Sequence, residues 1–544
     1  MSVNEWSREI KESFGDLVDI LEMKWKNHLG IRVREPDKLP EVAKKLKELG
    51  FSQNLLITAI DWIDENRIEL VYHFNRMDSR AIAWVRTSVP RDNPEVPSIW
   101  KIFRSSVIHE IETFDLMGVT FKGHPDLRRM FLPPDWNLPP PQRKDFDPKM
   151  ARNYDWRSKV YEAYNPYQEV IAKENDTIYY LSVGPQHPAM HGCWRLLLKC
   201  EGDTILEAWP EFGFVHRGIE KLAEYRTYEQ ISIFTDRFDY IASLAWNLTY
   251  AMAVEDLLGI EVPEPAKWLR VALAEMQRII SHLTWLAAAC ADIGTFHSMF
   301  LYTIREREKL FDLVEMLSGA RLTYTLTRIG GVGIFKHADT IPDGWFNRVL
   351  DFVKEFRKRM KEYEEIVFSN ETFYVRTRGI GVIRGKAAIE AGATGPVLRA
   401  AGIRYDVRKI APYMVYEEVD FEIPTGTKGD VFDRWYVRFR EMQESARIIE
   451  QVIEQMPKSG PLRIKVPPPK FKVSGEGFAR TENPRGEAML YIIGRGGDKP
   501  YRMRVRSPTL CNLYLTHYLL RGARIADLPA IVGSLDPSMG EVDR

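Results

Sequence analysis

The chain has 544 residues, of which 45% are hydrophobic, and its 76 basic and 76 acidic side chains cancel. This length exceeds what one hydrophobic core supports, so we expect at least two domains. The balanced charge argues against a general nucleic-acid-binding protein, although it leaves room for a local basic patch. The N-terminal segment lacks the basic start and apolar run of a secretory signal, so we expect a cytoplasmic protein.

Two further features exclude classes of protein. The most apolar long segment, 271–293, contains charged residues such as Glu275 and Arg278, which make it too polar to cross a bilayer unaided. We therefore expect membrane attachment only through partners. No C-x-x-C pair occurs among the cysteines, which are Cys193, Cys200, Cys290 and Cys511. Their spacing predicts free thiols rather than disulfides or a cysteine-held iron–sulfur cluster.

The first part of the chain alternates helical and strand patterns. After an amphipathic opening, three runs have the length and composition of strands: LLITAIDW (55–62), RIELVYHF (67–74) and RAIAWVRTSVP (80–90). These runs are consistent with a meander that carries helices on one face. We therefore predict a small α/β sandwich domain over residues 1–150.

Prolines mark the end of this domain. Residues 131–148 contain six prolines, which fix φ and remove backbone donors, so neither a helix nor a sheet ladder can continue there. We predict a stiff, extended connector in this stretch and a linker at 151–176. A second domain would then occupy residues 177–544.

The second domain opens with two strand-like segments, 177–184 and 193–210, and continues with helical periodicity. In 266–290, apolar residues recur at steps of three and four, the spacing of a core-facing helical stripe. Similar stripes cover 238–258, 302–327 and 343–366. We predict a central bundle of long helices, with irregular and strand-like segments at 371–435 and 460–510.

One segment, 456–525, has a pronounced charge excess, with 14 basic residues against four acidic ones. The excess predicts either a solvated face or a docking surface for an acidic or anionic partner. No interleaved aromatic pattern accompanies it, so we do not expect nucleic acid as a partner.

Glycine clusters at 330–333, 379–385 and 494–497 match neither G-x-G-x-x-G nor the P-loop spacing. Turns that need positive φ explain them adequately. We therefore predict no nucleotide site.

Two segments are rich in hydrogen-bonding side chains. GPQHPAMHG (184–192) places His187 and His191 on a loop between two expected strands. Metal binding is disfavoured because no further ligand lies nearby and Pro188 opposes a helical arrangement of the two rings. A substrate-facing loop and a structural turn both fit. The segment 211–230, with Arg217 and Tyr228, is by itself typical of an amphipathic helix start with a polar face.

Together with five further segments, these motifs resemble in register the 49-kDa-type subunit of respiratory complex I, from about residue 180 to the last residue. The five segments are 236–260, 280–296, 302–324, 393–430 and 529–544. Residues 108–136 and 143–147 are similar to the 30-kDa-type subunit of the same enzyme, a match that covers about 25–150. A fusion of both types on one chain is known in bacterial enzymes of this class. Within the 30-kDa-type match, Glu110, Glu112 and Asp115 would suggest an acidic turn in a scaffolding domain.

The 49-kDa-type lineage includes the [NiFe] hydrogenases, whose metal is held by two C-x-x-C pairs. The corresponding positions here are Asp239 and Ala242, and Ser538 and Glu541. Because all four thiolates are absent, nickel and iron have no soft ligands, and we predict no metal site. The resemblance implies an α+β chain whose second domain is hydrogenase-large-subunit-like, with a central long-helix bundle, peripheral strands and an emptied cavity that receives a quinone headgroup.

The resemblance implies roles for five residues. His191 and Tyr228 would flank the two quinone oxygens, and Asp292 would orient the imidazole and stabilise its cation. Reduction creates negative charge on both oxygens, so two donors suit this place, a protonated phenol and an imidazole that can be recharged. Arg217 would lie beside a [4Fe–4S] cluster held by a partner subunit. His187 would be a further cofactor-binding residue.

The implied assembly is a hetero-oligomer of the NADH:quinone oxidoreductase type that translocates ions and is active only when complete. Its other members would be an iron–sulfur small subunit (B-type), a ferredoxin-like subunit (I-type) and a membrane subunit (H-type). Quinone would be the substrate, and this chain would bind no cofactor through its own ligands. The chain would lie peripherally on the cytoplasmic face of the cell membrane. The electron donor (NADH, ferredoxin or a deazaflavin) and the pumped ion are decided on other chains.

The chain departs from the family at one position. Complex I subunits commonly have Arg-Met-His where this chain has Arg321-Leu322-Thr323. Thr323 cannot titrate, so we expect a weaker pH dependence of the cluster and a lower-potential acceptor such as menaquinone, or a non-quinone acceptor. Two alternatives stay open: a related membrane complex that reduces polysulfide or a similar small molecule, and a non-catalytic scaffold with a vestigial pocket.

Overall fold

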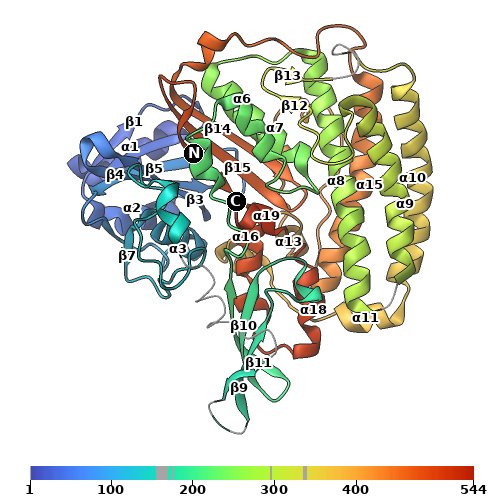
Figure 1. The fold of residues 1–544 in the computed structure, drawn as a ribbon, viewed down its shortest axis with the longest axis horizontal. Coiled ribbons are helices and arrows are strands. Elements are labelled where there is room, and N and C mark those ends of the chain that lie inside the picture. Colours follow the sequence, from blue (N-terminus) through green and yellow to red (C-terminus); the bar gives the residue numbers. More distant parts are fainter. Residues whose placement is uncertain (1, 155–169, 174, 176, 295–296, 335–339) are drawn as a thin grey trace. The chain divides into compact units, whose positions relative to one another are not determined.

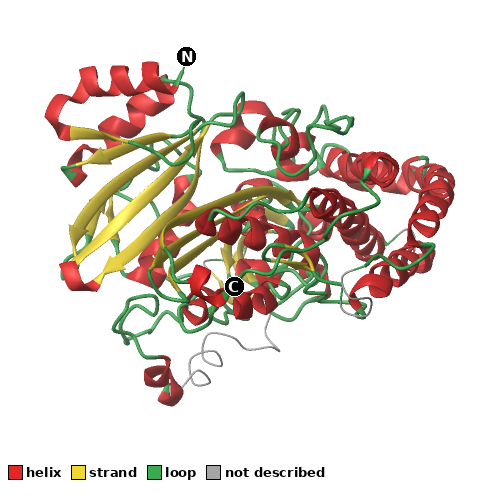
Figure 2. Cartoon of the chain, turned by 90° about the horizontal axis from the view of Figure 1, so that it is seen from above, coloured by secondary structure: helices red, strands yellow, loops and turns green. Residues whose placement is uncertain are grey.

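The computed structural model describes residues 2–154, 170–173, 175, 177–294, 297–334 and 340–544. The chain divides into two compact units, of which the first comprises Met1–Ile171, Glu211–Phe214 and Lys386–Ala393 and the second comprises the rest. Strands and helices occur in both units (Figures 1 and 2), so the predicted α+β class is confirmed. Much of the linker predicted at 151–176, namely 155–169, 174 and 176, lies outside the described residues.

The first unit is built on a five-stranded sheet with the strand order β1-β2-β5-β4-β3. The three runs predicted as strands are confirmed, because β3 (Gln53–Trp62), β4 (Arg67–Asn75) and β5 (Ile82–Pro90) form an antiparallel meander. On the far side of β5, β2 (Leu29–Val33) pairs in parallel with β5 and antiparallel with β1 (Val18–Leu21). The remaining elements are α1 (Val3–Phe14), α2 (Leu39–Glu48), β6 (Glu95–Pro97), α3 (Ser106–Met117), β7 (Thr120–Lys122) and α12 (Gly385–Glu390).

Helices α1 and α2 share one apolar core with the sheet. Trp6 of α1 and Leu46 of α2 belong to the same buried cluster as Ile57 and Ala59, alternate residues of β3. Helix α1 begins at a capping box, in which Ser2 accepts from the backbone N–H of Glu5 while the Glu5 carboxylate accepts from that of Ser2. The sequence therefore fixes both where this helix starts and which face it buries.

Three acidic residues of the first unit lie on helix α3 and not in an acidic turn. Glu110, Glu112 and Asp115 are all buried. Asp115 Oδ2 accepts hydrogen bonds from the backbone N–H groups of residues 130–132, at 3.0, 2.7 and 3.0 Å. The proline-rich segment 131–148 is thereby tied to the first unit through a series of turns, and the prediction of a stiff, extended connector is wrong.

The second unit begins with the strands that carry the histidine loop. Strands β9 (Ile178–Val183), β10 (Arg195–Glu201) and β11 (Thr204–Glu211) belong to a sheet of order β11-β10-β9-β8, with β8 at Val170–Lys173. The segment 193–210, predicted as one strand, is a hairpin. Gly202, with φ 58°, lies at its turn, a conformation that favours glycine.

Four long helices pack side by side in the second unit (Figures 1 and 2): α8 (Glu264–Ile293), α9 (His297–Ser318), α10 (Trp345–Phe368) and α15 (Val431–Gln455). The predicted helix bundle is confirmed. Helix α9 ends nine residues before the predicted limit, because Gly319 closes it with a bond from its N–H to the Glu315 carbonyl. Helix α15 escaped prediction because arginines and glutamates interrupt its apolar stripe.

The segments around the bundle are more helical than expected. Residues 371–410, predicted as irregular or strand-like, contain short helices, while the strands expected after residue 460 are present as a sheet of order β14-β15-β16. Helix α7 (Ser243–Leu258) packs against β14 and β15. The other elements are α5 (Ile219–Ala223), α6 (Tyr228–Thr235), β12 (Thr327–Arg328), β13 (Gly331–Val332), α11 (Glu371–Thr377), α13 (Gly395–Ala400), α14 (Val407–Ile410), β14 (Ser474–Asn483), β15 (Gly486–Arg495), β16 (Pro500–Arg506), α16 (Pro508–Tyr514), α17 (Thr516–Leu519), α18 (Leu528–Gly533) and α19 (Met539–Val542).

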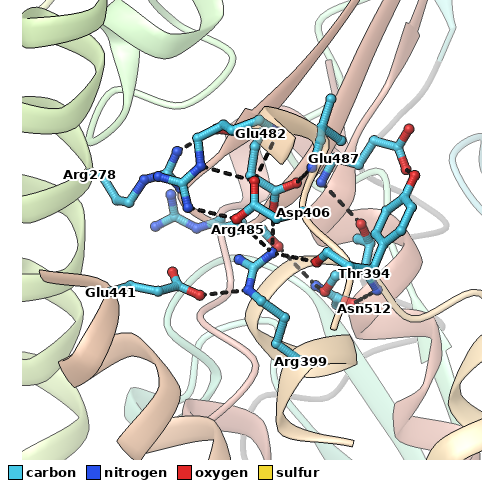
Figure 3. Close-up of polar contacts among 12 residues, drawn as sticks. Arg278, Thr394, Arg399, Asp406, Glu441, Glu482, Arg485, Glu487 and Asn512 are labelled. Atoms are coloured by element: carbon cyan, nitrogen blue, oxygen red, sulfur yellow. Dashed lines mark hydrogen bonds and ion pairs between the residues drawn. The ribbon is translucent and has the colours of Figure 1, made fainter. Parts of the chain in front are cut away.

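A network of buried ion pairs joins α8, α13, α15 and β14 (Figure 3). The guanidinium of Arg399 donates to Glu441 and to Glu482, both at 2.8 Å, and lies 3.5 Å from Asp406. Arg278 adds a bond of 2.6 Å from α8 to the Glu482 carbonyl. These side chains are 2% exposed or less, so each charge relies on its partners for solvation.

The basic excess of 456–525 is in part internal. Five of its arginines are 2–6% exposed, namely Arg480, Arg485, Arg502, Arg504 and Arg506. Glu220 pairs with Arg502 at 2.9 Å and with Arg504 at 3.2 Å. For these five arginines, both predicted explanations, a solvated face and a docking surface, are wrong.

Two findings concern the membrane and the thiols. No helix in the described part of the chain is both long and apolar enough to cross a membrane. All four cysteines are free, and Cys200, Cys290 and Cys511 are buried.

Replacing Arg399 with Met should destabilise the chain by about 3–5 kcal/mol, because buried carboxylates lose their counter-charge. Arg321→Met is the matched control, since Arg321 also contacts three carboxylates, those of Glu308, Asp312 and Glu315, but is 42% exposed. We expect less than about 1 kcal/mol from this exposed site. Denaturant unfolding of the purified chain measures both, and equal losses would contradict the assignment.

Candidate active site

The loop between β9 and β10 presents the two histidines. Pro188–Met190 form a single 3-10 turn, which His187 caps by accepting from the Ala189 N–H at 3.2 Å. Trp194, fully buried, donates its indole N–H to the Met190 carbonyl at 2.8 Å and anchors the turn from the other side. His187 is exposed, and its ring is engaged with its own backbone.

His191 ends this turn in the left-handed conformation, with φ 51°, which histidine tolerates better than most residues. Its Nε2 lies 2.5 Å from Oδ2 of Asp292, at the C-terminal end of α8. The side chains are only 14% and 11% exposed, so the pair is shielded from bulk water. The structure thus brings together two of the predicted site residues, which lie 101 positions apart in the chain.

Gly533, the last residue of α18, makes room for this pair. A Cβ at Gly533 would lie 2.6 Å from Asp292 Oδ2 and 3.9 Å from His191 Cε1, so any side chain would push on the carboxylate. The backbone here is also fixed, because Trp285 of α8 donates its indole N–H to the Gly533 carbonyl at 2.7 Å. The motif PAIVGSLDP therefore forms one wall of the site.

Three of the four positions compared above with the hydrogenase cysteines lie together, namely Asp239, Ser538 and Glu541. Asp239 pairs with Arg485 and is hydrogen-bonded by Ser538, and the charge of Glu541 faces Asp239. Arg485 also pairs with Asp536 at 3.0 Å. Among the described residues, no three His, Cys, Asp or Glu side chains gather in an arrangement that could hold a metal ion.

Tyr228, the predicted second donor, lies in different surroundings. It is fully buried in an apolar cluster with Ile231 and Trp246, and its ring stacks on Phe471 at 6.2 Å. Its hydroxyl has no hydrogen-bond partner among the described residues and lies 3.1 Å from where a Cβ at Gly494 would stand. Burial raises the pKa of Tyr228 to about 12, so it stays a neutral phenol. Its role as a proton donor stays a prediction.

Tyr240 is a second tyrosine of interest, which the sequence-based interpretation missed. It directly follows Asp239 in the turn between α6 and α7, is 55% exposed and lies within electrostatic reach of Arg485. The signal was available in the motif DRFDYIA, which was interpreted through its metal-ligand positions alone.

Arg217 holds two other parts of this region together. Its Nη2 donates to the carbonyls of Arg237 at 2.8 Å and Gly540 at 3.1 Å, so it bridges the α6–α7 turn to α19. The side chain itself is exposed. Such a position leaves the guanidinium accessible to a partner subunit.

Thr323, the position at which the sequence departs from the resemblance, lies in the irregular segment after α9 with φ 51°. The neighbouring Thr325, also at positive φ, donates its hydroxyl to Asp236. Burial raises the pKa of Asp236 to about 6. A titratable group therefore remains beside this segment although the histidine is absent.

Gly533→Ala should couple energetically to Asp292, because the new methyl group collides with the carboxylate. In a double-mutant cycle with Asp292→Ala we expect a coupling of about 1 kcal/mol, measured by denaturant unfolding. Gly497→Ala provides the control, since its nearest atom would be 3.9 Å away. A coupling as small as the control's would show that Gly533 does not shape the pair.

Comparison with known proteins places the chain in a family. The model of the 49 Kd subunit of respiratory-chain NADH dehydrogenase matches residues 292–474 and 467–544, and the model of the 30 Kd subunit matches residues 32–152. Among solved structures, a chain of the membrane-bound sulfane sulfur reductase, an archaeal respiratory membrane complex, is 38% identical with a TM-score of 0.65 and covers 69% of this chain and 100% of its own.

Curated relatives agree with both resemblances. The D-type subunit of NADH-quinone oxidoreductase from Desulforamulus reducens is 47% identical over 67% of this chain and 97% of its own length. The C/D-type subunit from Methylococcus capsulatus is 35% identical over 89% of this chain and 87% of its own. The second C/D-type subunit from Aquifex aeolicus is 37% identical and covers 98% of both chains. The chain therefore belongs to the family of fused C/D-type subunits of NADH-quinone oxidoreductase, in which a 30-kDa-type and a 49-kDa-type sequence are joined.

Proposed function

We propose that the chain forms most of the quinone headgroup pocket of a membrane-associated, ion-translocating oxidoreductase of the NADH:quinone type. The observation that carries the proposal is the shielded His191–Asp292 pair at 2.5 Å, on the wall formed by Gly533. The family supplies the class of reaction, and this pair supplies a proton donor where the family binds its acceptor.

The pair suits the reduction of a quinone, which takes up two electrons and two protons. The carboxylate of Asp292 contacts Nε2 of His191 and fixes the ring, which leaves Nδ1 as the atom that would deliver a proton to the acceptor. Because the pair is only 11–14% exposed, the interaction is little screened by water. His191 thus fits the role of a proton donor that Asp292 orients.

A second donor is needed for the other quinone oxygen, and Tyr240 fits this role better than Tyr228. Tyr240 is exposed beside Asp239, whereas the Tyr228 hydroxyl is buried in the apolar cluster. A neutral phenol that can reach a ligand is what the reaction requires, because a donor must lie within hydrogen-bond reach of the oxygen it protonates.

The electrons would reach this pocket from a [4Fe–4S] cluster in a B-type partner subunit, beside Arg217. The ferredoxin-like I-type and membrane H-type subunits complete the proposed assembly, with this chain peripheral on the cytoplasmic face of the membrane. No cofactor would be held by the chain's own ligands. The exposed guanidinium of Arg217, fixed by two backbone carbonyls, supports a docking role because its position is set before a partner arrives.

A sulfur compound is the second candidate acceptor. It is favoured by the likeness to a chain of the membrane-bound sulfane sulfur reductase, which this chain matches over that chain's full length. The same donors would then protonate a sulfur anion released by reduction. Thr323 in place of the family's histidine is compatible with either acceptor.

Asp292→Asn should lower acceptor reduction by the assembled complex about 100-fold or more, because the His191 ring loses the carboxylate that orients it. Asp312→Asn on α9, which is exposed, is the control and should be silent. Activity is measured with a quinone and, separately, with polysulfide, and electron entry is checked with an artificial dye. Full activity of Asp292→Asn with both acceptors would favour a non-catalytic scaffold.

The two tyrosines are distinguished by removing each hydroxyl. We expect Tyr240→Phe to lower acceptor reduction about 100-fold. Tyr228→Phe should leave the rate unchanged and stability unchanged or slightly higher, because it removes a buried hydroxyl without a described partner. The reverse pattern in the same assay would restore Tyr228 as the donor.

A further inference from the structure

The place of the lost thiolates now holds three buried carboxylates and one guanidinium. Arg485 pairs with Asp239 and with Asp536, and its Nε donates to the Asp536 carbonyl at 2.9 Å. Glu541 is the third carboxylate and is fully buried, whereas Asp239 and Asp536 are 1% and 3% exposed. If all three carboxylates were ionised, this cluster would carry two uncompensated negative charges inside the protein, an arrangement of high energy.

Within the described residues, Glu541 is the carboxylate of this cluster that forms no ion pair with a basic side chain. Its Oε2 accepts from the Trp246 indole at 2.9 Å, and Oε1 accepts from the Thr509 N–H at 2.8 Å and the Ser507 hydroxyl at 3.2 Å. All three donors are neutral. Burial and then the charge of Asp239 raise the pKa of Glu541 to about 7, and Arg485 acts in the opposite direction.

Another buried glutamate shows the contrast. Glu220 faces three arginines, Arg502, Arg504 and Arg544, at 2.9, 3.2 and 3.4 Å. Their charges hold the pKa of Glu220 well below its usual range. For Glu220, the contacts with cations therefore outweigh burial, whereas no ion pair is found for Glu541 among the described residues.

We propose that Glu541 is a proton store of the acceptor pocket, holding one exchangeable proton at neutral pH in the cluster that replaces the metal. The cluster is connected to the site at two points. Asp536 lies in the turn that begins at Gly533, and Gly533 lies against Asp292. Asp239 directly precedes Tyr240 in the chain. Loss of the proton would place another negative charge in the wall of the pocket. The redox part of this proposal rests on the proposed function, whereas the stored proton itself does not.

The stored proton has a defined effect on stability. The pKa of Glu541 is higher in the folded chain, about 7, than the ordinary value of 4.5, so the folded state binds more protons between these limits. The free energy of unfolding should therefore fall as pH rises from about 4.5 to about 7 on account of this group. Glu541→Gln removes this contribution because the amide stays neutral.

The store is tested by infrared spectroscopy of the oxidised complex without acceptor, from about pH 5 to about pH 9. The wild type should show a protonated-carboxyl C=O band that loses half its intensity near pH 7. Glu541→Gln should remove the component of this band that titrates near pH 7, and Glu220→Gln should keep it. A band unchanged in Glu541→Gln would overturn the proposal.

If the complex does not assemble with Glu541→Gln, Trp246→Phe provides a second test. Removing the indole N–H takes away a bond that favours the charged carboxylate, so the band should persist to higher pH. An unshifted band would overturn the proposal as well. Acceptor reduction is then followed against pH in the same variants. A titrating band together with no reduction of quinone or polysulfide would refute the proposed function. The proposal that Glu541 stores a proton would still hold.

Discussion

Compensation of buried charge is the constraint on which the second unit depends. Arg399 on α13 is solvated by Glu441 of α15 and Glu482 of β14, together with Asp406, and these carboxylates in turn have no comparable access to water (Figure 3). A buried ion pair contributes little net stability over an apolar pair, but removing one partner is strongly destabilising. The network therefore specifies how the elements pack: only one register of the bundle helices against the sheet pairs all of these charges.

The active-site geometry follows from the same constraint. Helix α8 is locked along its length, by Arg278 to the β14 carbonyl of Glu482 and by His282 to Glu441 at 2.9 Å. Its C-terminal end then delivers Asp292 to a fixed point, where the short turn of the β9–β10 loop presents His191. A carboxylate on a rigid helix and a histidine on a tightly anchored turn form a preorganised pair, an arrangement that would suit a site at which charge develops.

A cluster of charged residues stands where the resemblance to hydrogenases implies the positions of metal ligands. Asp239 and Asp536 pair with Arg485, whereas Ala242 and Ser538 carry no charge and Glu541 is the proposed site of a stored proton. The residues around Arg485 form part of the wall of the site, and one of them, Glu541, can titrate. For an acceptor that takes up protons as well as electrons, such a wall is chemically more useful than an apolar plug.

The three strands of the first unit, the long-helix stripes and the four missing thiolates follow from the sequence alone, because hydrophobic periodicity and ligand identity are local properties. His191 and Asp292 were identified through a family resemblance, and the structure then brought them together. Tertiary structure alone decided what remained. Arg399, Arg485 and Arg502 have the local signature of surface residues, and each has a carboxylate partner that lies 42 to 282 positions away. Likewise only packing separates Tyr228, turned into the apolar cluster, from Tyr240, turned outward, because two tyrosines of one motif-rich segment look alike until the core selects which one it buries.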